Sequence, residues 1–297
     1  MKGVGSDLEK PLQILIEKNL EALLGVRFLS TEYSTGKTHA GRIDTLGLDE
    51  NNCPVILEYK RSSGENVINQ GLFYLDWLMD HQAEFKLLVL DRYGKSAADA
   101  IDWAARRVIC IAADFTKYDA HAVQQMERDI QLIRYRKFEG ELLLLELVNP
   151  PASKVNVGVK AAAKSVMAGK GVAKRGEDNT GGQYPVGLSE HMRPLFGSLE
   201  GHLLSLGDDV ERKDLKLYIA FKRIKNFVTV EIRKQKLLLY LRLNPDNVDL
   251  TEGFSRDVRG IGHWGTGDVE IVLKDQTDLD RAKQLILRAY VGGSGAA

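Results

Sequence analysis

Two short runs, Gly41-Arg42-Ile43-Asp44 and Ile56-Leu57-Glu58-Tyr59-Lys60, decide how this chain of 297 residues is interpreted. The turn sequence Asp49-Glu50-Asn51-Asn52 separates them, so we expect two strands paired as an antiparallel hairpin. Side chains alternate along a strand, so Glu58 and Lys60 should point to the same face, with Tyr59 turned toward the core. In such a hairpin Asp44 lies near Glu58.

Two carboxylates at one place, with a lysine beside them, suit the hydrolysis of a phosphodiester. Mg²⁺ prefers oxygen ligands, and Mg²⁺ or Mn²⁺ would neutralise phosphate oxygens and activate a water. The lysine would orient or deprotonate that water and stabilise developing charge. A lone Glu-x-Lys means little, since Glu84-Phe85-Lys86 and Glu211-Arg212-Lys213 share the pattern. The alternative is a surface ion pair beside an ordinary acid near a turn.

The helix expected over residues 65–80 adds two polar groups to this pattern. Gln70 and Tyr74 stand four residues apart, so they lie on one helical face. They either support the site or its substrate, or serve as a packing aromatic with a polar neighbour.

Taken together, these motifs resemble the PD-(D/E)XK nuclease superfamily, in its RecB-like and NucS-like branch. The resemblance covers about residues 7–148 and implies a restriction-endonuclease-like core that acts on DNA. It implies a divalent metal held by two carboxylates, a catalytic lysine, and two supporting residues on the next helix: Asp44 and Glu58, Lys60, and Gln70 with Tyr74. Arg42 would contact the nucleic acid. The residue before the first acid is Ile43 rather than proline, a departure common in divergent members.

The family often adds an acid from the first helix, which apolar periodicity places over residues 7–24. Glu17 is the candidate for this further metal ligand. Glu21 lies one turn later, and the sequence does not separate the two. For either acid a solvated position on the helix is the alternative.

Composition divides the chain into residues 1–150, a linker over 151–185, and residues 186–297. Residues 151–183 hold six basic and two acidic residues, and residues 152–183 contain no Phe, Trp, Tyr or Leu, so we expect a flexible basic tether. The first part should be an α/β mixed sheet flanked by helices. Its expected strands are 26–33, 38–48, 54–60, 86–90, 108–112 and two within 129–148, with Trp103 in a helix.

The last part should be a small α+β domain with a meander-like sheet between helices near 188–206 and 276–290. Nine basic residues lie between 212 and 236, with interleaved aromatics, and we expect nucleic-acid contacts from a hairpin loop carrying Lys222, Arg223 and Lys225. Alternatively these residues are ordinary turn cations. Trp264 is expected to be a packed loop anchor rather than a base-stacking platform. This part resembles an uncharacterised family labelled a predicted transport protein.

Overall composition is that of a globular chain, with 44% hydrophobic and 28% charged residues and a net charge of zero. Neither a bilayer-spanning run nor a secretory segment is evident, and Cys53 and Cys110 make no metal-type pair, so we expect a cytoplasmic protein.

The expected function is a Mg²⁺- or Mn²⁺-dependent endodeoxyribonuclease of repair or defence. The alternative is a nuclease-fold module that binds nucleic acid or regulates a complex, with little or no cleavage. RNA remains open as a substrate, and a homodimer or a protein partner of the last domain is compatible with the sequence.

Overall fold

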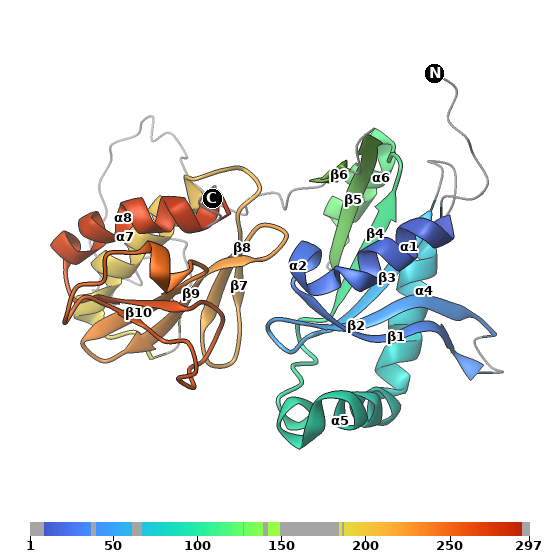
Figure 1. Cartoon of the computed structure of the whole chain (residues 1–297), viewed down its shortest axis with the longest axis horizontal. Coiled ribbons are helices and arrows are strands. Elements are labelled where there is room, and N and C mark those ends of the chain that lie inside the picture. The colour runs from blue at the N-terminus through green and yellow to red at the C-terminus, as the bar shows by residue number, and fades with distance from the viewer. Residues whose placement is uncertain are drawn as a thin grey trace, which may run out of the picture.

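The computed structural model describes residues 9–36, 40–60, 67–126, 128–138, 142–148, 184–185 and 187–292. Two six-stranded sheets, each with its own helices, lie side by side (Figure 1). We call residues 9–148 the N-terminal unit and residues 184–292 the C-terminal unit. The expected tether, 151–185, lies almost wholly outside the described residues, so its flexibility and the domain boundaries stay predictions.

The N-terminal sheet runs β1-β2-β3-β4-β5-β6 in simple sequence order. Its first three strands are antiparallel, β3, β4 and β5 are parallel, and β6 returns antiparallel to β5. The bounds are β1 (Val26–Ser34), β2 (Arg42–Asp49), β3 (Pro54–Lys60), β4 (Arg107–Ala112), β5 (Asp129–Phe138) and β6 (Leu142–Leu147). The parallel strands β3 and β4 are apolar almost throughout because helices cover both faces. The expected mixed α/β sheet is confirmed.

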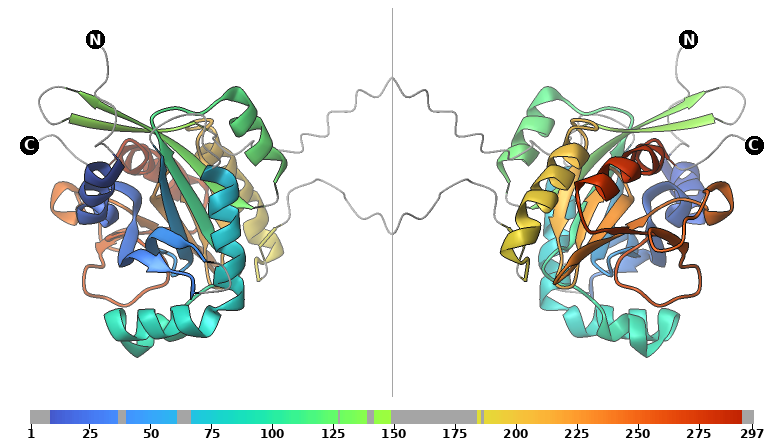
Figure 2. Two further views of the ribbon diagram at one scale, coloured as in Figure 1. Left: turned by 90° about the vertical axis from the view of Figure 1, so that its right-hand side faces the viewer. Right: turned by 90° about the vertical axis from the view of Figure 1, so that its left-hand side faces the viewer.

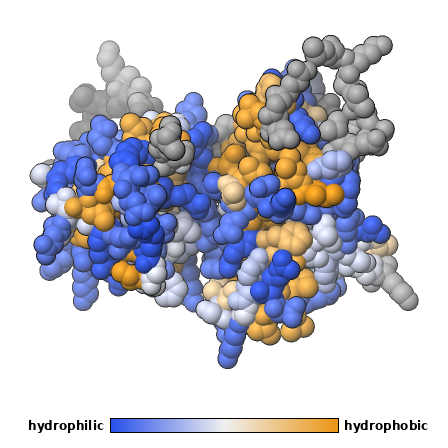
Figure 3. Space-filling view, viewed as in Figure 1, coloured by the Kyte–Doolittle hydropathy of each residue, from blue (hydrophilic) through white to orange (hydrophobic). Residues whose placement is uncertain are grey.

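Helices form a layer on each face of this sheet. On one face, α1 (Glu9–Lys18) and α2 (Leu20–Leu24) pack on a core that includes Tyr59. On the other, α4 (Val67–Asp80), α5 (Gln82–Asp99) and α6 (Lys117–Gln125) enclose a second core around Trp77. In the space-filling view, apolar side chains gather over α1, α2 and β6 (Figure 3), where Ile14 and Leu142 are more than half exposed.

Three expectations about this unit were wrong in detail. The first helix divides at Asn19, which leaves helical geometry at ψ 20° before α2. Residues 86–90 are helical, because the short apolar run is part of α5, where Phe85 and Val89 point inward while Leu87 is exposed. Periodicity cannot separate a strand from a buried helix over so few residues. Trp103 lies in the irregular segment before β4 rather than in a helix.

The C-terminal unit is the expected α+β meander with an extra strand at each edge. Its order is β11-β12-β10-β9-β8-β7, antiparallel throughout. The strands are β7 (Glu211–Asp214), β8 (Ile219–Lys222), β9 (Asn226–Arg233), β10 (Lys236–Leu241), β11 (Ser255–Asp257) and β12 (Val269–Leu273). Helices α7 (Arg193–Leu204) and α8 (Gln276–Tyr290) pack together on one face of the sheet (Figure 2).

Candidate active site

The hairpin of β2 and β3 brings Asp44 and Glu58 together. The register pairs Thr45 with Leu57, so the two acids are the next residues along the ladder. The Asp44 amide donates to Glu58 Oε1 at 3.3 Å, and the Tyr59 amide donates to Asp44 Oδ2 at 2.9 Å. Each carboxylate is therefore held by the backbone of the strand that carries the other.

Glu58 is the more constrained of the two acids. Its side chain is 0% exposed, and its Oε2 has no hydrogen-bond partner among the described residues. Burial, with the adjacent Asp44 charge, raises the pKa of Glu58 to about 9. Burial also raises the pKa of Asp44, although the Tyr59 amide and Lys60 oppose this.

Lys60 closes β3 on the same side of the sheet as Glu58. Its Nζ lies 3.8 Å from Glu9 Oε1 at the start of α1, and its charge acts on Asp44. The side chain is mostly buried, with 16% exposed. The lysine thus lies beside an acid of α1 and near enough to Asp44 for its charge to act on that carboxyl.

The structure does not bring Glu17 against the carboxylate pair. Its Oε1 accepts from Thr45 Oγ1 at 2.6 Å and from Gln13 Nε2 at 3.0 Å, on the face of β2 opposite Asp44. Glu21 is exposed. The acid of the first helix that lies nearest the site is Glu9, 3.8 Å from Lys60 Nζ, and no sequence signal marks it because it precedes the apolar stripe that begins at Leu12.

A second missed residue is Gln13, which supports the strand that carries Asp44. It is 3% exposed, and its Nε2 also donates to the Asp44 carbonyl at 2.8 Å. A polar residue inside the buried stripe of α1, between Leu12 and Ile16, was the available signal.

Gln70 and Tyr74 support the entry to β2 rather than the acids themselves. The Arg42 amide donates to the Tyr74 hydroxyl at 3.1 Å, and Gln70 Nε2 donates to it at 3.4 Å. The tyrosine ring packs so closely on Gly41 that a Cβ there would lie 2.7 Å from it. The Arg42 side chain is 66% exposed and pairs with Glu32 at 3.3 Å. Its guanidinium thus lies at the surface two residues before Asp44.

Of the three cations of the expected C-terminal hairpin loop, Lys222 and Lys225 contact the N-terminal unit, whereas Arg223 pairs within the C-terminal unit. Lys222 is 1% exposed and pairs with Asp129 at 3.6 Å and Glu211 at 3.3 Å, so this lysine offers no charge to a nucleic acid. Lys225 Nζ donates to the Ala22 carbonyl, and Arg223 pairs with Asp209 at 2.5 Å. The loop docks on the N-terminal unit because its amides and cations meet acceptors there.

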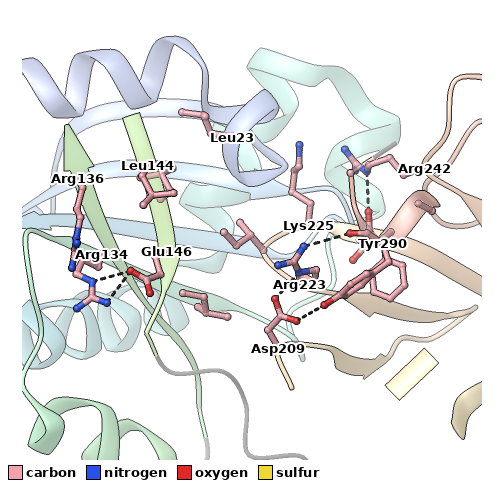
Figure 4. A pocket seen from close by; sticks show the side chains of 17 residues that line it. Leu23, Arg134, Arg136, Leu144, Glu146, Asp209, Arg223, Lys225, Arg242 and Tyr290 are labelled. Atoms are coloured by element: carbon pink, nitrogen blue, oxygen red, sulfur yellow. Dashed lines mark hydrogen bonds and ion pairs between the residues drawn. The ribbon is translucent and has the colours of Figure 1, made fainter. Parts of the chain in front are cut away.

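Further polar contacts join the two units around these cations. Lys213 Nζ lies 2.8 Å from Asp129 Oδ2, and Asn226 Nδ2 donates to Asn51 Oδ1 at 2.6 Å. Arg242 pairs with Glu50. A cleft of about 820 Å³ remains between β5 and β6 on one side and Arg223, Lys225 and Tyr290 on the other (Figure 4). The contacts of Asp129, Asn51 and Glu50 lie near the start of β3, at the opposite end of this strand from Lys60.

Comparison with known proteins places the chain among distant relatives. A family model described as "Domain of unknown function (DUF5655)" matches residues 183–291 and attaches no activity to them. An uncharacterized protein of Haemophilus influenzae is 28% identical over 284 residues, which are 95% of this chain and 92% of that protein.

Two solved structures are distantly similar to this one. A repair endonuclease from Pyrococcus abyssi is 19% identical, with 45% of this chain and 49% of that one covered and a TM-score of 0.28. A structure titled "Structure of EndoMS-dsDNA2 complex" is 22% identical, with 46% and 48% covered and a TM-score of 0.26. The chain thus matches about half the length of either. Likeness at this level carries no argument about activity, which must come from the site.

None of the helices among the described residues is both long and apolar enough to cross a bilayer. No group of three or more His, Cys, Asp or Glu side chains among the same residues is placed to hold a metal. A metal here would rest on the Asp44–Glu58 pair.

Proposed function

We propose that the chain is a metal-dependent endodeoxyribonuclease that hydrolyses phosphodiester bonds in DNA, in repair or defence. The observation that supports this most is the pair of adjacent carboxylates, the buried Glu58 and the half-buried Asp44, beside Lys60 at one end of a sheet. Glu58 Oε2 has no partner in the described part of the chain, and the pKa of its carboxyl is raised to about 9.

The residues fit a divalent cation. Mg²⁺ is commonly held by one or two carboxylates together with waters and substrate phosphates, and Mn²⁺ accepts the same oxygen ligands. Asp44 and Glu58 would hold it, with the unpartnered Oε2 as a ligand atom. Once bound, the cation would neutralise phosphate charge and lower the pKa of a water.

The protein's own groups supply the rest of the chemistry. Lys60 is placed to orient the attacking water and to stabilise the negative charge that develops on the phosphate. Glu9, 3.8 Å from Lys60 Nζ, limits where that lysine can lie. Gln13 and Tyr74 hold the backbone of β2 on either side of Asp44, so they position the acid without touching the substrate. Arg42, exposed at the same strand start, would contact a DNA phosphate.

Cleavage of labelled DNA tests the proposal. Single-stranded, double-stranded and branched substrates, and an RNA, are incubated with purified protein in Mg²⁺ or Mn²⁺, beside Asp44→Ala and Lys60→Ala. Asp91→Ala is the matched control, because Asp91 is exposed on α5, away from the hairpin. We expect cleavage by the wild type and by Asp91→Ala only. Equal cleavage by Asp44→Ala would refute the site.

A readout without catalysis separates the proposal from its alternative, a nuclease-fold binding module. A cation bound only by the folded state raises the melting temperature. We expect Mn²⁺ to raise it for wild type and Asp91→Ala but not for Asp44→Ala. The absence of any shift at millimolar Mn²⁺, together with DNA binding and no cleavage, would favour the module.

A further inference from the structure

The C-terminal sheet has one face that no helix among the described residues covers. Helices α7 and α8 pack on the face that carries Leu237, Leu239 and Leu241 of β10 (Figure 1). The alternate residues of β10, Leu238 and Tyr240, belong to a separate small core on the opposite face. Because side chains alternate along a strand, Lys236 shares that second face.

A cavity of about 520 Å³ lies on this second face, between the sheet and the loop that follows β11. Part of its wall is aromatic. The rings of Tyr240 and His263 are stacked, with centroids 4.3 Å apart and planes inclined by 19°. Trp264 lines the same cavity and is 52% exposed, so it is not the packed anchor that the sequence predicts.

The polar groups of the cavity are arranged with acids inside and cations outside. Glu231 and Glu270 are buried at 6% and 3% exposure, whereas their partners Arg233 and Arg256 are 55% and 59% exposed. The pairs neutralise the acids but leave guanidinium edges at the rim. His263 Nδ1 lies 2.9 Å from the Ile261 carbonyl, and its buried Nε2 has no partner in the described structure.

Two further lysines extend this basic rim along the sheet. Lys236 lies opposite Arg233 of β9 in the antiparallel ladder. Lys274 directly follows Leu273, the last residue of β12, which lies opposite Leu237 of β10. A smaller hollow of about 240 Å³ connects them to Arg256. Tyr240 lies four positions along the strand from Lys236, which is about 13 Å. Aromatic rings thus stand at one end of a strip and cations follow along it.

We propose that this strip binds single-stranded nucleic acid, with a base stacked on Trp264 and the backbone phosphates along Arg256, Arg233, Lys236 and Lys274. Stacking on an aromatic face and pairing of phosphates with a line of cations are the two elements of such binding, and both occur here on one open sheet face. An acidic peptide would use the cations but would have no use for the indole. The proposal does not depend on the nuclease site, which lies in the other unit.

The test uses the full-length chain in EDTA, so that metal-dependent cleavage does not remove the probe. A short labelled single-stranded oligodeoxynucleotide is titrated by fluorescence anisotropy. We expect Trp264→Ala to raise Kd roughly 5- to 150-fold, the range for the loss of one stacked base. Tyr118→Ala, which removes a remote aromatic that is 72% exposed on α6, should leave Kd unchanged.

A second measurement covers the cations without touching the aromatic wall. Lys236→Ser with Lys274→Ser should lower the slope of log K against log salt by roughly 0.7 for each lysine. Lys283→Ser, on α8, is the matched control. An unchanged Kd in Trp264→Ala, an unchanged salt slope in the lysine variant, or equal competition by polyglutamate would each overturn the proposal. None of these results depends on whether Asp44 supports cleavage.

Discussion

Replacing Glu58 by glutamine should stabilise the metal-free protein and remove much of its pH dependence. The buried Glu58 carboxyl has a pKa of about 9 in the folded state, against an ordinary value of 4.5. Between these values the folded state holds a proton that the unfolded state has lost. The free energy of unfolding therefore falls as the pH rises through this window. The stabilisation that the proton on Glu58 provides is complete only below pH 4.5.

The size of the effect follows from the same shift. One unit of pKa corresponds to about 1.4 kcal/mol, so the wild type should lose about 3 kcal/mol of stability between pH 5 and pH 7 through this group. Glutamine resembles the protonated acid and keeps the oxygen that accepts from the Asp44 amide. The free energy of unfolding of Glu58→Gln should therefore exceed that of the wild type by a similar amount at pH 7 in EDTA.

Urea unfolding at pH 5, 6, 7 and 8 measures this difference. Glu252→Gln is the control, because Glu252 is exposed in the C-terminal unit. The pKa of Asp44 is also raised, so the pH dependence of either protein alone does not isolate Glu58. The decisive quantity is the difference in free energy of unfolding between Glu58→Gln and the wild type at each pH. A gap that stays constant from pH 5 to pH 8 would refute the buried, protonated Glu58. With Mn²⁺ added, the wild type should become more stable than Glu58→Gln if Glu58 holds the cation.

Three other substitutions test separate parts of the structure. Lys60→Ala should lower the cleavage rate by at least about 100-fold while the Mn²⁺-induced shift in melting temperature persists. Cleavage by this variant at the wild-type rate would exclude the lysine from the chemistry. Tyr74→Phe removes the hydroxyl that accepts from the Arg42 amide and should destabilise by about 1 kcal/mol, measured by urea unfolding; no change would mean that water replaces it. Asp129→Asn leaves Lys222 and Lys213 less compensated and should lower the free energy of unfolding by about 3–5 kcal/mol. Nearby cations lower the pKa of Asp129, so the contribution of this carboxylate to stability should fade as the pH falls below 3.8, the ordinary pKa of an aspartate. The free energy of unfolding of Asp129→Asn should therefore fall less steeply in acid than that of the wild type, and an equally steep fall would contradict this.

The strands were predicted well where pattern and turn signals agree. Residues 54–60 form a strand with the expected bounds, and α8 covers 276–290 as its periodicity predicts. The helical segment at 86–90 was missed because four apolar residues in a row fit a strand and a helix equally well. β7 and β11 were missed because edge strands of three or four polar residues carry almost no periodic signal.

The candidate site was predicted in its hairpin but not in its surroundings. Asp44 and Glu58 lie together because a short turn joins their strands, and that is a local property of the sequence. The choice among Glu9, Glu17 and Glu21 depended on where α1 crosses the sheet, which no local pattern specifies. Gln13 and Tyr74 likewise acquire their roles only through contact with β2.

The sequence by itself determined the alternation that puts Glu58 and Lys60 on one face, the strand that carries them, and the meander of the last hundred residues. Only the tertiary structure decided which charges are buried. Lys222 looked like a loop cation and is instead enclosed, because Asp129, from a distant part of the chain, pairs with it. Trp264 looked like a packed anchor and is half exposed. Periodicity is set by neighbours in sequence, whereas burial of a charge or a ring is set by neighbours in space.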